Sequence, residues 1–132
     1  MSTVFSKIIS GEIPAYKVAE NDRFLAFLDV NPLCAGHTLV IPKQEVDWIF
    51  DIEDQEFTEL HLFAKKVALG IKETVPCVKV GVAVIGLEVP HAHIHLVPMN
   101  AIADLNFSGP RAHFSAEEFT LLAEKIASNI NF

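Results

Sequence analysis

Three histidines at alternate positions are the residues most able to do chemistry in this chain: His91, His93 and His95. Side chains alternate between the two faces of a β-strand, so a strand here would place all three imidazoles on one face. The opposite face would carry apolar side chains and could pack into a core. Prolines on both sides, Pro90 and Pro98, predict a strand with abrupt ends whose histidine face looks toward solvent or a ligand.

The spacing of the histidines alone leaves three interpretations open. The run could be a solvated strand face that happens to carry histidine. It could be a metal site, because imidazoles at i and i+2 can converge on one ion and zinc takes four ligands, or three and a water. It could also supply an imidazole as nucleophile and proton donor, which the near-neutral pKa of histidine permits. No cysteine or acidic residue lies beside the histidines at a useful spacing, which places the metal interpretation last.

The 132 residues fit a single domain, spanning 1–132, that can bury a real core. A formal net charge of −7 argues against a nucleic-acid partner, since such binders normally carry a basic face. No signal pattern opens the chain and its apolar runs are short, so we expect a cytoplasmic protein with no membrane partner. Apolar residues make up 51% of the chain, a mild indication of self-association. Cys34 and Cys77 are expected to be small buried side chains.

The elements that must position the histidines follow from periodicity and turn residues. We expect a short helix over 3–10 and a long amphipathic helix over 54–73. Besides the histidine run, strands are predicted over 16–19, 24–28, 37–41 and 78–85. A last helix begins after Ser115, whose spacing from Glu118 is typical of a capping box. The loop 99–114 before this helix is long enough to be functional.

The strand at 78–85 is nearly all apolar and β-branched, which predicts burial on both of its faces. It would pair with the histidine strand in an antiparallel hairpin. Together the elements predict an α+β fold, in which a mostly antiparallel five-stranded sheet carries one long helix, a short N-terminal helix and a C-terminal helix. Residues 99–132 would form a variable C-terminal loop and helix.

Several blocks of the sequence together resemble the histidine triad (HIT) family of nucleotide hydrolases and transferases. The blocks are Phe5–Ala15, Leu25–Pro32, Gly36–Lys43 and His91–Val97. The last block fits the family signature His-φ-His-φ-His-φ-φ, in which φ is apolar. The likeness is to the nucleotide phosphoramidase (Hint-like) type. It implies a HIT-like fold, a small-molecule nucleotide substrate with a purine as the expected base, a homodimer and no cofactor.

The resemblance implies a role for each of four histidines. His93 would attack the α-phosphorus of a nucleoside phosphate derivative, such as a nucleoside 5′-phosphoramidate, and carry the nucleotidyl group covalently. His95 would hold that ring in its tautomer and orientation, while His91 and His37 would complete a relay beside the phosphate. Such chemistry is reasonable, because a neutral imidazole can attack phosphorus and a protonated histidine nearby would steady the phosphate oxygens.

The resemblance also implies a nucleotide-binding pocket. Asp29 would accept the ribose hydroxyls, and the base would lie in an apolar slot formed by Phe5, Ile8, Phe27, Leu28 and Val30. Glu88 stands where many relatives carry the hydroxyl residue of a Gly-Gln-Ser/Thr segment, beside the leaving group. Some bacterial relatives hold a structural zinc; the corresponding positions here are Thr3, Ser6 and Glu45, so no metal is expected.

The altered segment 84–89 keeps two alternatives open. A dinucleoside polyphosphate hydrolase would use the same His93 with a different leaving group. A nucleotide-binding or partner-binding module would keep the pocket but have weakened catalysis. Turnover of an adenosine phosphoramidate, turnover of diadenosine polyphosphates, and binding without turnover distinguish the three possibilities.

Overall fold

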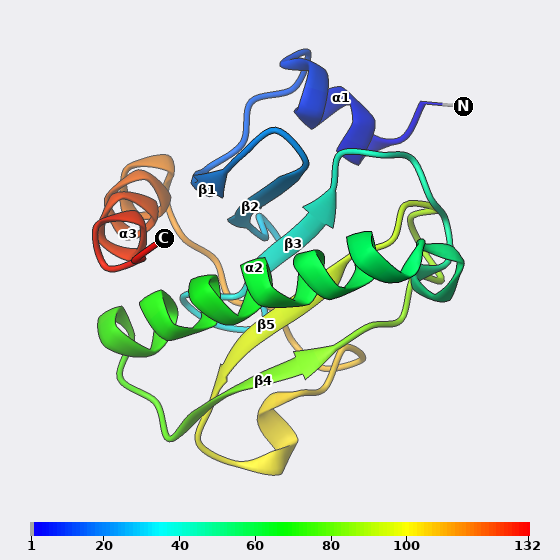
Figure 1. Ribbon diagram of the computed structural model, residues 1–132. Coiled ribbons are helices and arrows are strands. Elements are labelled where there is room, and N and C mark those ends of the chain that lie inside the picture. Colours follow the sequence, from blue (N-terminus) through cyan, green and yellow to red (C-terminus); the bar gives the residue numbers. More distant parts are fainter. Residues whose placement is uncertain (1) are drawn as a thin grey trace.

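A five-stranded antiparallel sheet lies at the centre of the computed structural model, which describes residues 2–132 (Figure 1). The strands are β1 (Lys17–Glu20), β2 (Phe24–Leu28), β3 (Thr38–Pro42), β4 (Lys79–Ala83) and β5 (Ile94–Met99), in the spatial order β1-β2-β3-β5-β4. The helices are α1 (Val4–Ser10), α2 (Asp54–Thr74) and α3 (Ala116–Ser128), with short 3₁₀ turns at Ile49–Asp51 and Ile102–Asp104. Every neighbouring pair of strands is antiparallel, which confirms the predicted α+β fold.

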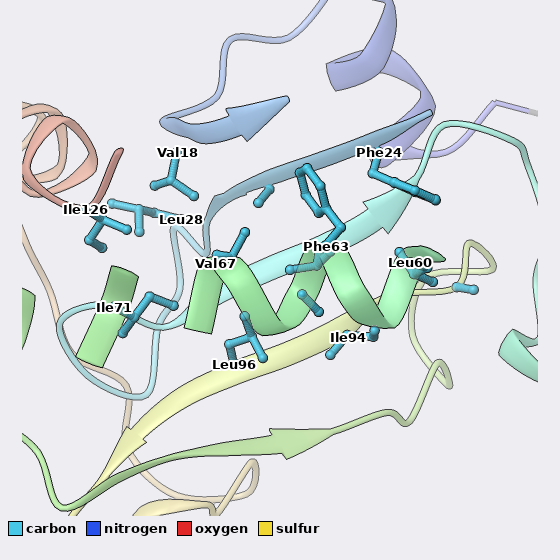
Figure 2. Close-up of a cluster of buried hydrophobic side chains, with 14 of the residues drawn as sticks. Val18, Phe24, Leu28, Leu60, Phe63, Val67, Ile71, Ile94, Leu96 and Ile126 are labelled. Atoms are coloured by element: carbon cyan, nitrogen blue, oxygen red, sulfur yellow. The ribbon is translucent and has the colours of Figure 1, made fainter. Parts of the chain in front are cut away.

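The main core lies between the sheet and the long helix α2, which crosses one face of the sheet (Figures 1 and 2). Leu60, Val67 and Ile71 of α2 are fully buried against apolar side chains of β5. The helix α3 packs beside α2 and adds Ile126 to the same cluster. The predicted capping box starts this helix, since the Ser115 hydroxyl accepts a hydrogen bond from the Glu118 N–H at 3.1 Å.

The opposite face of the sheet is covered by α1, where a second, smaller core forms. Alternation along β2 divides its side chains between the two faces, so that Leu25 and Phe27 point toward α1 rather than α2. Phe5 and Ile8 of α1 pack against them. The helix ends at Gly11, whose φ of +85° is the left-handed conformation that glycine adopts at low cost. This small core forms the floor of the cavity described below.

The strand predicted to be buried on both faces is instead the edge of the sheet. Within residues 2–132, β4 pairs only with β5, and the exposed fractions of Val78 and Val82 are 63% and 59%. The prediction was wrong because apolar, β-branched composition is compatible with an edge strand as well as with a central one. The antiparallel pairing with the histidine strand is confirmed.

Cys34 and Cys77, which were expected to be buried, are half-buried.

The boundaries of the histidine strand also differ from the prediction. β5 begins only at Ile94, and Pro98 lies within it, opposite Val80 of β4. The alternation survives this shift, since Ala92, Ile94 and Leu96 all belong to the main core. The preceding chain is tied down by a different contact, in which the Ala92 N–H donates to the Val46 carbonyl at 2.6 Å.

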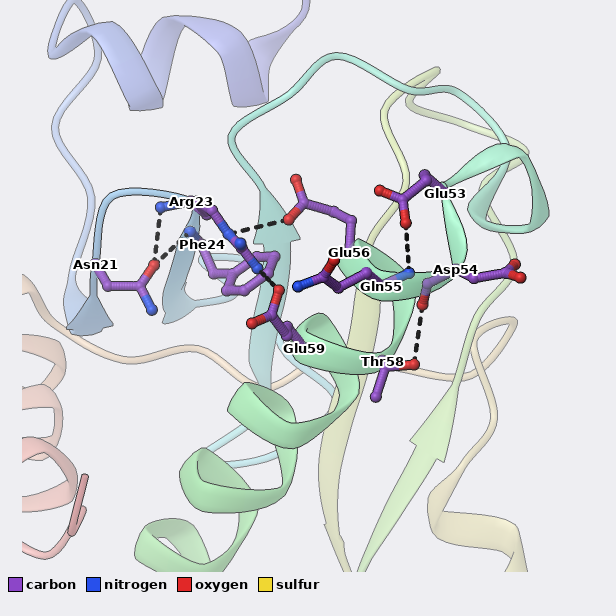
Figure 3. Close-up of polar contacts among 9 residues, drawn as sticks. All are labelled: Asn21, Arg23, Phe24, Glu53, Asp54, Gln55, Glu56, Thr58 and Glu59. Carbon is purple, nitrogen blue, oxygen red and sulfur yellow. Dashed lines mark hydrogen bonds and ion pairs between the residues drawn. The ribbon is translucent and has the colours of Figure 1, made fainter.

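A partly exposed ion-pair cluster joins the β1–β2 turn to the start of α2 (Figure 3). Arg23 contacts the carboxylates of Glu56, at 3.0 Å from Nε to Oε1, and of Glu59. Exposed pairs of this kind each contribute at most about 1 kcal/mol to stability.

Among the helices of residues 2–132, none has both the length and the apolar character needed to cross a bilayer.

Candidate active site

A cavity of about 410 Å³ opens between α1, the segment after β2, the segment 85–89 and a chain segment near residue 110. Its volume is in the range of small-molecule sites. Most of the sequence-predicted site residues line it: Phe5, Ile8, Phe27, Leu28, Asp29, Val30, Glu88, His93 and His95. Two of the predicted residues, His37 and His91, do not line it and lie behind the cavity wall.

His93 is held in a single tautomer by the main chain. Its Nδ1 lies 2.8 Å from the backbone carbonyl oxygen of His91. Because a carbonyl only accepts hydrogen bonds, Nδ1 must carry the proton, and Nε2 keeps a free lone pair. The edge of the Phe5 ring packs against the imidazole, with 4.9 Å between ring centroids. Burial lowers the pKa of His93, which favours this neutral form.

His37 and His95 form a directed chain of hydrogen bonds that begins at the backbone. The Leu33 N–H donates to Nδ1 of His37 at 3.0 Å, so the proton of a neutral His37 lies on Nε2. That Nε2 is 3.0 Å from Nδ1 of His95 and donates to it. The proton of His95 therefore lies on its own Nε2, and His95 lines the cavity. One backbone N–H thus orients two successive imidazoles.

Burial keeps both of these histidines neutral at neutral pH. It lowers the pKa of His37 to about 4, against a smaller opposing effect of the Asp29 carboxylate, which lies 3.6 Å from Nε2. Burial also lowers the pKa of His95 to about 3, and neighbouring His93 adds to this effect. We expected a protonated histidine beside the phosphate. In the structure the imidazole of His95 is neutral and offers an N–H, because burial disfavours its charged form.

His91 contributes through its position rather than through the cavity. Its side chain is fully buried, and Nε2 donates to the Pro42 carbonyl at 2.8 Å. Nδ1 has no hydrogen-bond partner among residues 2–132. The hydrogen bond from His91 Nε2 to Pro42 anchors the turn before β5 to the end of β3. It thereby fixes the His91 carbonyl that accepts the hydrogen bond from His93. His91 does not line the cavity, and its expected part in a relay beside the phosphate stays a prediction.

The predicted nucleoside-binding residues also line the cavity. Asp29 directly follows β2, and its Oδ1 accepts the Asn31 N–H at 2.9 Å, which closes a tight turn. The Phe5 and Phe27 rings meet edge to face, with 5.7 Å between centroids, and form an apolar wall. Val30 and Glu88 are exposed and lie at the rim of the cavity. An apolar slot that ends at a carboxylate is suited to a flat base joined to a hydroxylated sugar.

The sequence did not identify two further cavity residues, Phe107 and Arg111. They lie on residues 105–112, which we call the strap. The Phe107 ring packs against the His95 ring, with 4.7 Å between centroids. The Arg111 guanidinium donates to the carbonyls of Asn31, at 2.8 Å, and Phe107, at 3.1 Å. The length of loop 99–114 indicated that it could be functional, but no periodicity in it predicted which side chains reach the histidines.

Three side chains in the site could together bind a metal ion. Asp29, His37 and His95 each offer one ligand atom, and these atoms lie within 4.8 Å of one another. Two of the ring nitrogens, Nε2 of His37 and Nδ1 of His95, already share a hydrogen. An ion bound by these two nitrogens would displace that hydrogen and break the chain of hydrogen bonds that begins at Leu33.

Comparison with known proteins gives consistent matches. The family model of the HIT domain matches residues 10–102. The chain is 35% identical over 132 residues to the adenosine 5′-monophosphoramidase hnt1 of Schizosaccharomyces pombe, covering 98% of this chain and 99% of that protein. It is also 35% identical to an uncharacterized HIT-like protein of Borreliella burgdorferi, covering 96% and 97% of the two chains. A crystal structure of a Hit-like protein involved in cell-cycle regulation from Bartonella henselae superimposes with a TM-score of 0.85 at 27% identity, over 98% of this chain and 96% of the other.

Proposed function

Since the chain belongs to the HIT domain family, we propose that it hydrolyses nucleoside 5′-phosphoramidates through a covalent nucleotidyl intermediate on His93. The observation that carries this proposal is the hydrogen bond from His93 Nδ1 to the His91 carbonyl. It leaves Nε2 unprotonated on a residue that lines the cavity. The phosphoramidase name of the fission yeast relative supports the choice of leaving group.

In the first step, the Nε2 lone pair of His93 forms a bond to the α-phosphorus while the bond from phosphorus to the leaving nitrogen breaks. The substrate nitrogen takes up one proton from solvent as this bond breaks, so that it leaves with the bonding electron pair as a neutral amine, and the positive charge passes to the His93 ring. The adduct is a nucleotidyl-imidazolium whose Nδ1–H still donates to the His91 carbonyl. That carbonyl is therefore placed to stabilise the positive charge that develops on the ring.

In the second step, water attacks the same phosphorus and the P–N bond to His93 breaks. The ring returns to its neutral form, and the proton of the attacking water passes to solvent. In both steps the Nε2–H of His95 can donate to a phosphoryl oxygen, because its Nδ1 is occupied by the hydrogen from His37. Glu88, exposed at the cavity rim, would attract a leaving amine that becomes an ammonium ion.

The test follows a substrate labelled at the α-phosphorus and asks which residue of the protein becomes labelled. Rapid quenching during turnover of adenosine 5′-phosphoramidate should trap an acid-labile phosphorus–nitrogen adduct on His93. His93→Ala should lower turnover by several orders of magnitude, the scale of losing a covalent nucleophile. His61→Ala is the matched control, because His61 is exposed on α2 and its hydrogen bond is to the Phe57 carbonyl of its own helix. An adduct on another residue, or near-normal turnover by His93→Ala, would overturn the mechanism.

Hydrolysis of dinucleoside polyphosphates is a second candidate function, and the cation Arg111 beside the cavity favours it. The leaving group would then be a nucleoside polyphosphate rather than an amine, with the same attack by His93. Comparison of kcat/KM for diadenosine polyphosphates and adenosine 5′-phosphoramidate decides between the two. Nucleotide binding with no turnover of either substrate would identify a binding module with weakened catalysis.

A further inference from the structure

The cavity is lined by one formally cationic side chain among residues 2–132, and that side chain is Arg111. Two carboxylates, Asp29 and Glu88, also line it. The segment 85–89 adds apolar side chains and Glu88, and it offers no hydroxyl or amide side chain to an anion. A phosphate group that leaves water for this cavity needs a compensating positive charge or several strong donors.

The imidazoles do not supply that charge. His37 and His95 are buried and neutral at neutral pH, and His93 presents a lone pair. His95 can offer one N–H to a phosphoryl oxygen, but its contribution is that of a neutral donor. The full positive charge must therefore come from elsewhere in the lining, and Arg111 is the residue of that kind.

The guanidinium of Arg111 is held in place without being neutralised. Its two observed acceptors are backbone carbonyls, those of Asn31 and Phe107. No carboxylate lies within 4.0 Å of it in the part of the chain that the structure describes. Of the five N–H donors of a guanidinium, three remain for a ligand. An arginine clamped by neutral groups beside a cavity is prepared to bind an anion.

The strap fixes this charge next to the histidines. The Ala112 N–H donates to the Pro32 carbonyl at 2.9 Å, and the Phe107 ring packs on His95. Arg111 also contributes to lowering the pKa of both His37 and His95, so it lies within electrostatic reach of the two rings. The charge is therefore located beside His95, where the N–H to the phosphate is offered.

We propose that Arg111 is a substrate-binding residue that pairs with the phosphate of the nucleotide, and that the strap is part of the active site for this reason. The inference rests on the proposed function, because it takes a nucleoside phosphate as the ligand. It makes the site selective for ligands that carry a negative charge at the 5′ position over neutral nucleosides. In this proposal, the function of the loop 99–114 is to place the Arg111 cation beside the histidines.

The experiment compares the binding of adenosine 5′-monophosphate and adenosine by calorimetry at low ionic strength and about pH 8, where the phosphate is a dianion. Arg111→Gln should weaken monophosphate binding by about 10- to 100-fold, the scale of a lost hydrogen bond to a charged group. Adenosine should bind the variant as it binds the wild type, since the apolar slot and Asp29 are untouched. Arg111→Lys should recover part of the affinity through its charge.

Arg23→Gln is the matched control, because it removes the other arginine of the chain from an exposed ion-pair cluster outside the cavity. It should leave both affinities unchanged. Equal losses for adenosine and the monophosphate in Arg111→Gln would mean that Arg111 only supports the strap, and would overturn the proposal. Unchanged monophosphate binding in Arg111→Gln would overturn it as well. Because the readout is binding, it is independent of whether His93 forms an adduct, so either proposal can fail without the other.

Discussion

His37 and His95 meet between neighbouring strands of the sheet, with 3.0 Å from Nε2 of the first to Nδ1 of the second. His37 immediately precedes β3, and His95 lies in β5, so the antiparallel pairing of these strands brings together two rings 58 residues apart in sequence. The relationship makes His37 a positioning residue: it sets the tautomer of His95 without lining the cavity.

Replacement of His37 tests this role. His37→Leu removes the donor to His95, frees that ring to take the wrong tautomer and should lower kcat by about 10²-fold, the scale of one misplaced proton donor. Nucleoside binding should change little, so KM for adenosine 5′-phosphoramidate should stay close to normal. His37→Gln keeps an N–H donor and should be less impaired than His37→Leu. Steady-state kinetics of the two variants, with circular dichroism to verify folding, measures this difference. Equal activity of His37→Leu and His37→Gln would contradict the positioning role.

The lowered pKa values of the buried histidines predict how stability depends on pH. In the unfolded chain these rings take up protons near pH 6.5, whereas His37 and His95 in the folded chain do so only near pH 4 and pH 3. Between these limits the unfolded state binds more protons, so the free energy of unfolding must decrease as the pH falls below about 6.5. The slope approaches about 1.4 kcal/mol per pH unit for each ring.

Urea denaturation of the wild type at about pH 7.5 and about pH 5 should reveal this loss. The variant with both His37→Gln and His95→Gln should lose clearly less stability over the same interval, because glutamine does not titrate. Equal losses in the two proteins would mean that other groups account for the pH dependence.

Turnover should not depend on a tightly bound transition metal, because the proposed nucleophile is an imidazole rather than a metal-bound water. Extensive chelation should leave kcat for adenosine 5′-phosphoramidate unchanged. Added zinc should inhibit, since an ion held by Asp29, His37 and His95 would displace the hydrogen that joins the two rings. Stoichiometric zinc in the purified protein, whose removal abolishes turnover, would contradict this prediction.

A homodimer is expected, and the structure provides a surface for it. The outer edge of β4 has no strand partner among residues 2–132, and the apolar side chains of Val78 and Val82 are exposed there. A second copy could cover this apolar surface through a two-fold contact. Val82→Glu should then shift the protein toward a monomer in sedimentation experiments. Leu121→Glu is the control, since Leu121 is similarly exposed on α3, away from β4. A wild type that sediments only as a monomer at micromolar concentration would refute the dimer.

Much of the fold follows from local patterns in the sequence, but the completed site depends on distant contacts. Alternation predicted that Ile94 and Leu96 face the core and that His93 and His95 share the other face, because strand geometry depends only on neighbouring residues. The exposure of Val82 could not be read from the sequence, since it depends on β4 lying at the edge of the sheet, beside β5. Arg111 was missed for a similar reason: its bond to Asn31 spans 80 residues and leaves no periodic signal.

Main-chain groups determine where the protons lie in this site, and this has a consequence for how the sequence can diverge. The Leu33 N–H and the His91 carbonyl impose the tautomers, and both groups are present whatever side chain a position carries. Substitution at Leu33 by any residue other than proline should therefore preserve the arrangement of protons. A single-residue insertion between Leu33 and His37 would instead move the N–H away from the ring. We expect natural variants of this chain to tolerate changes of residue type in that loop but not changes of its length.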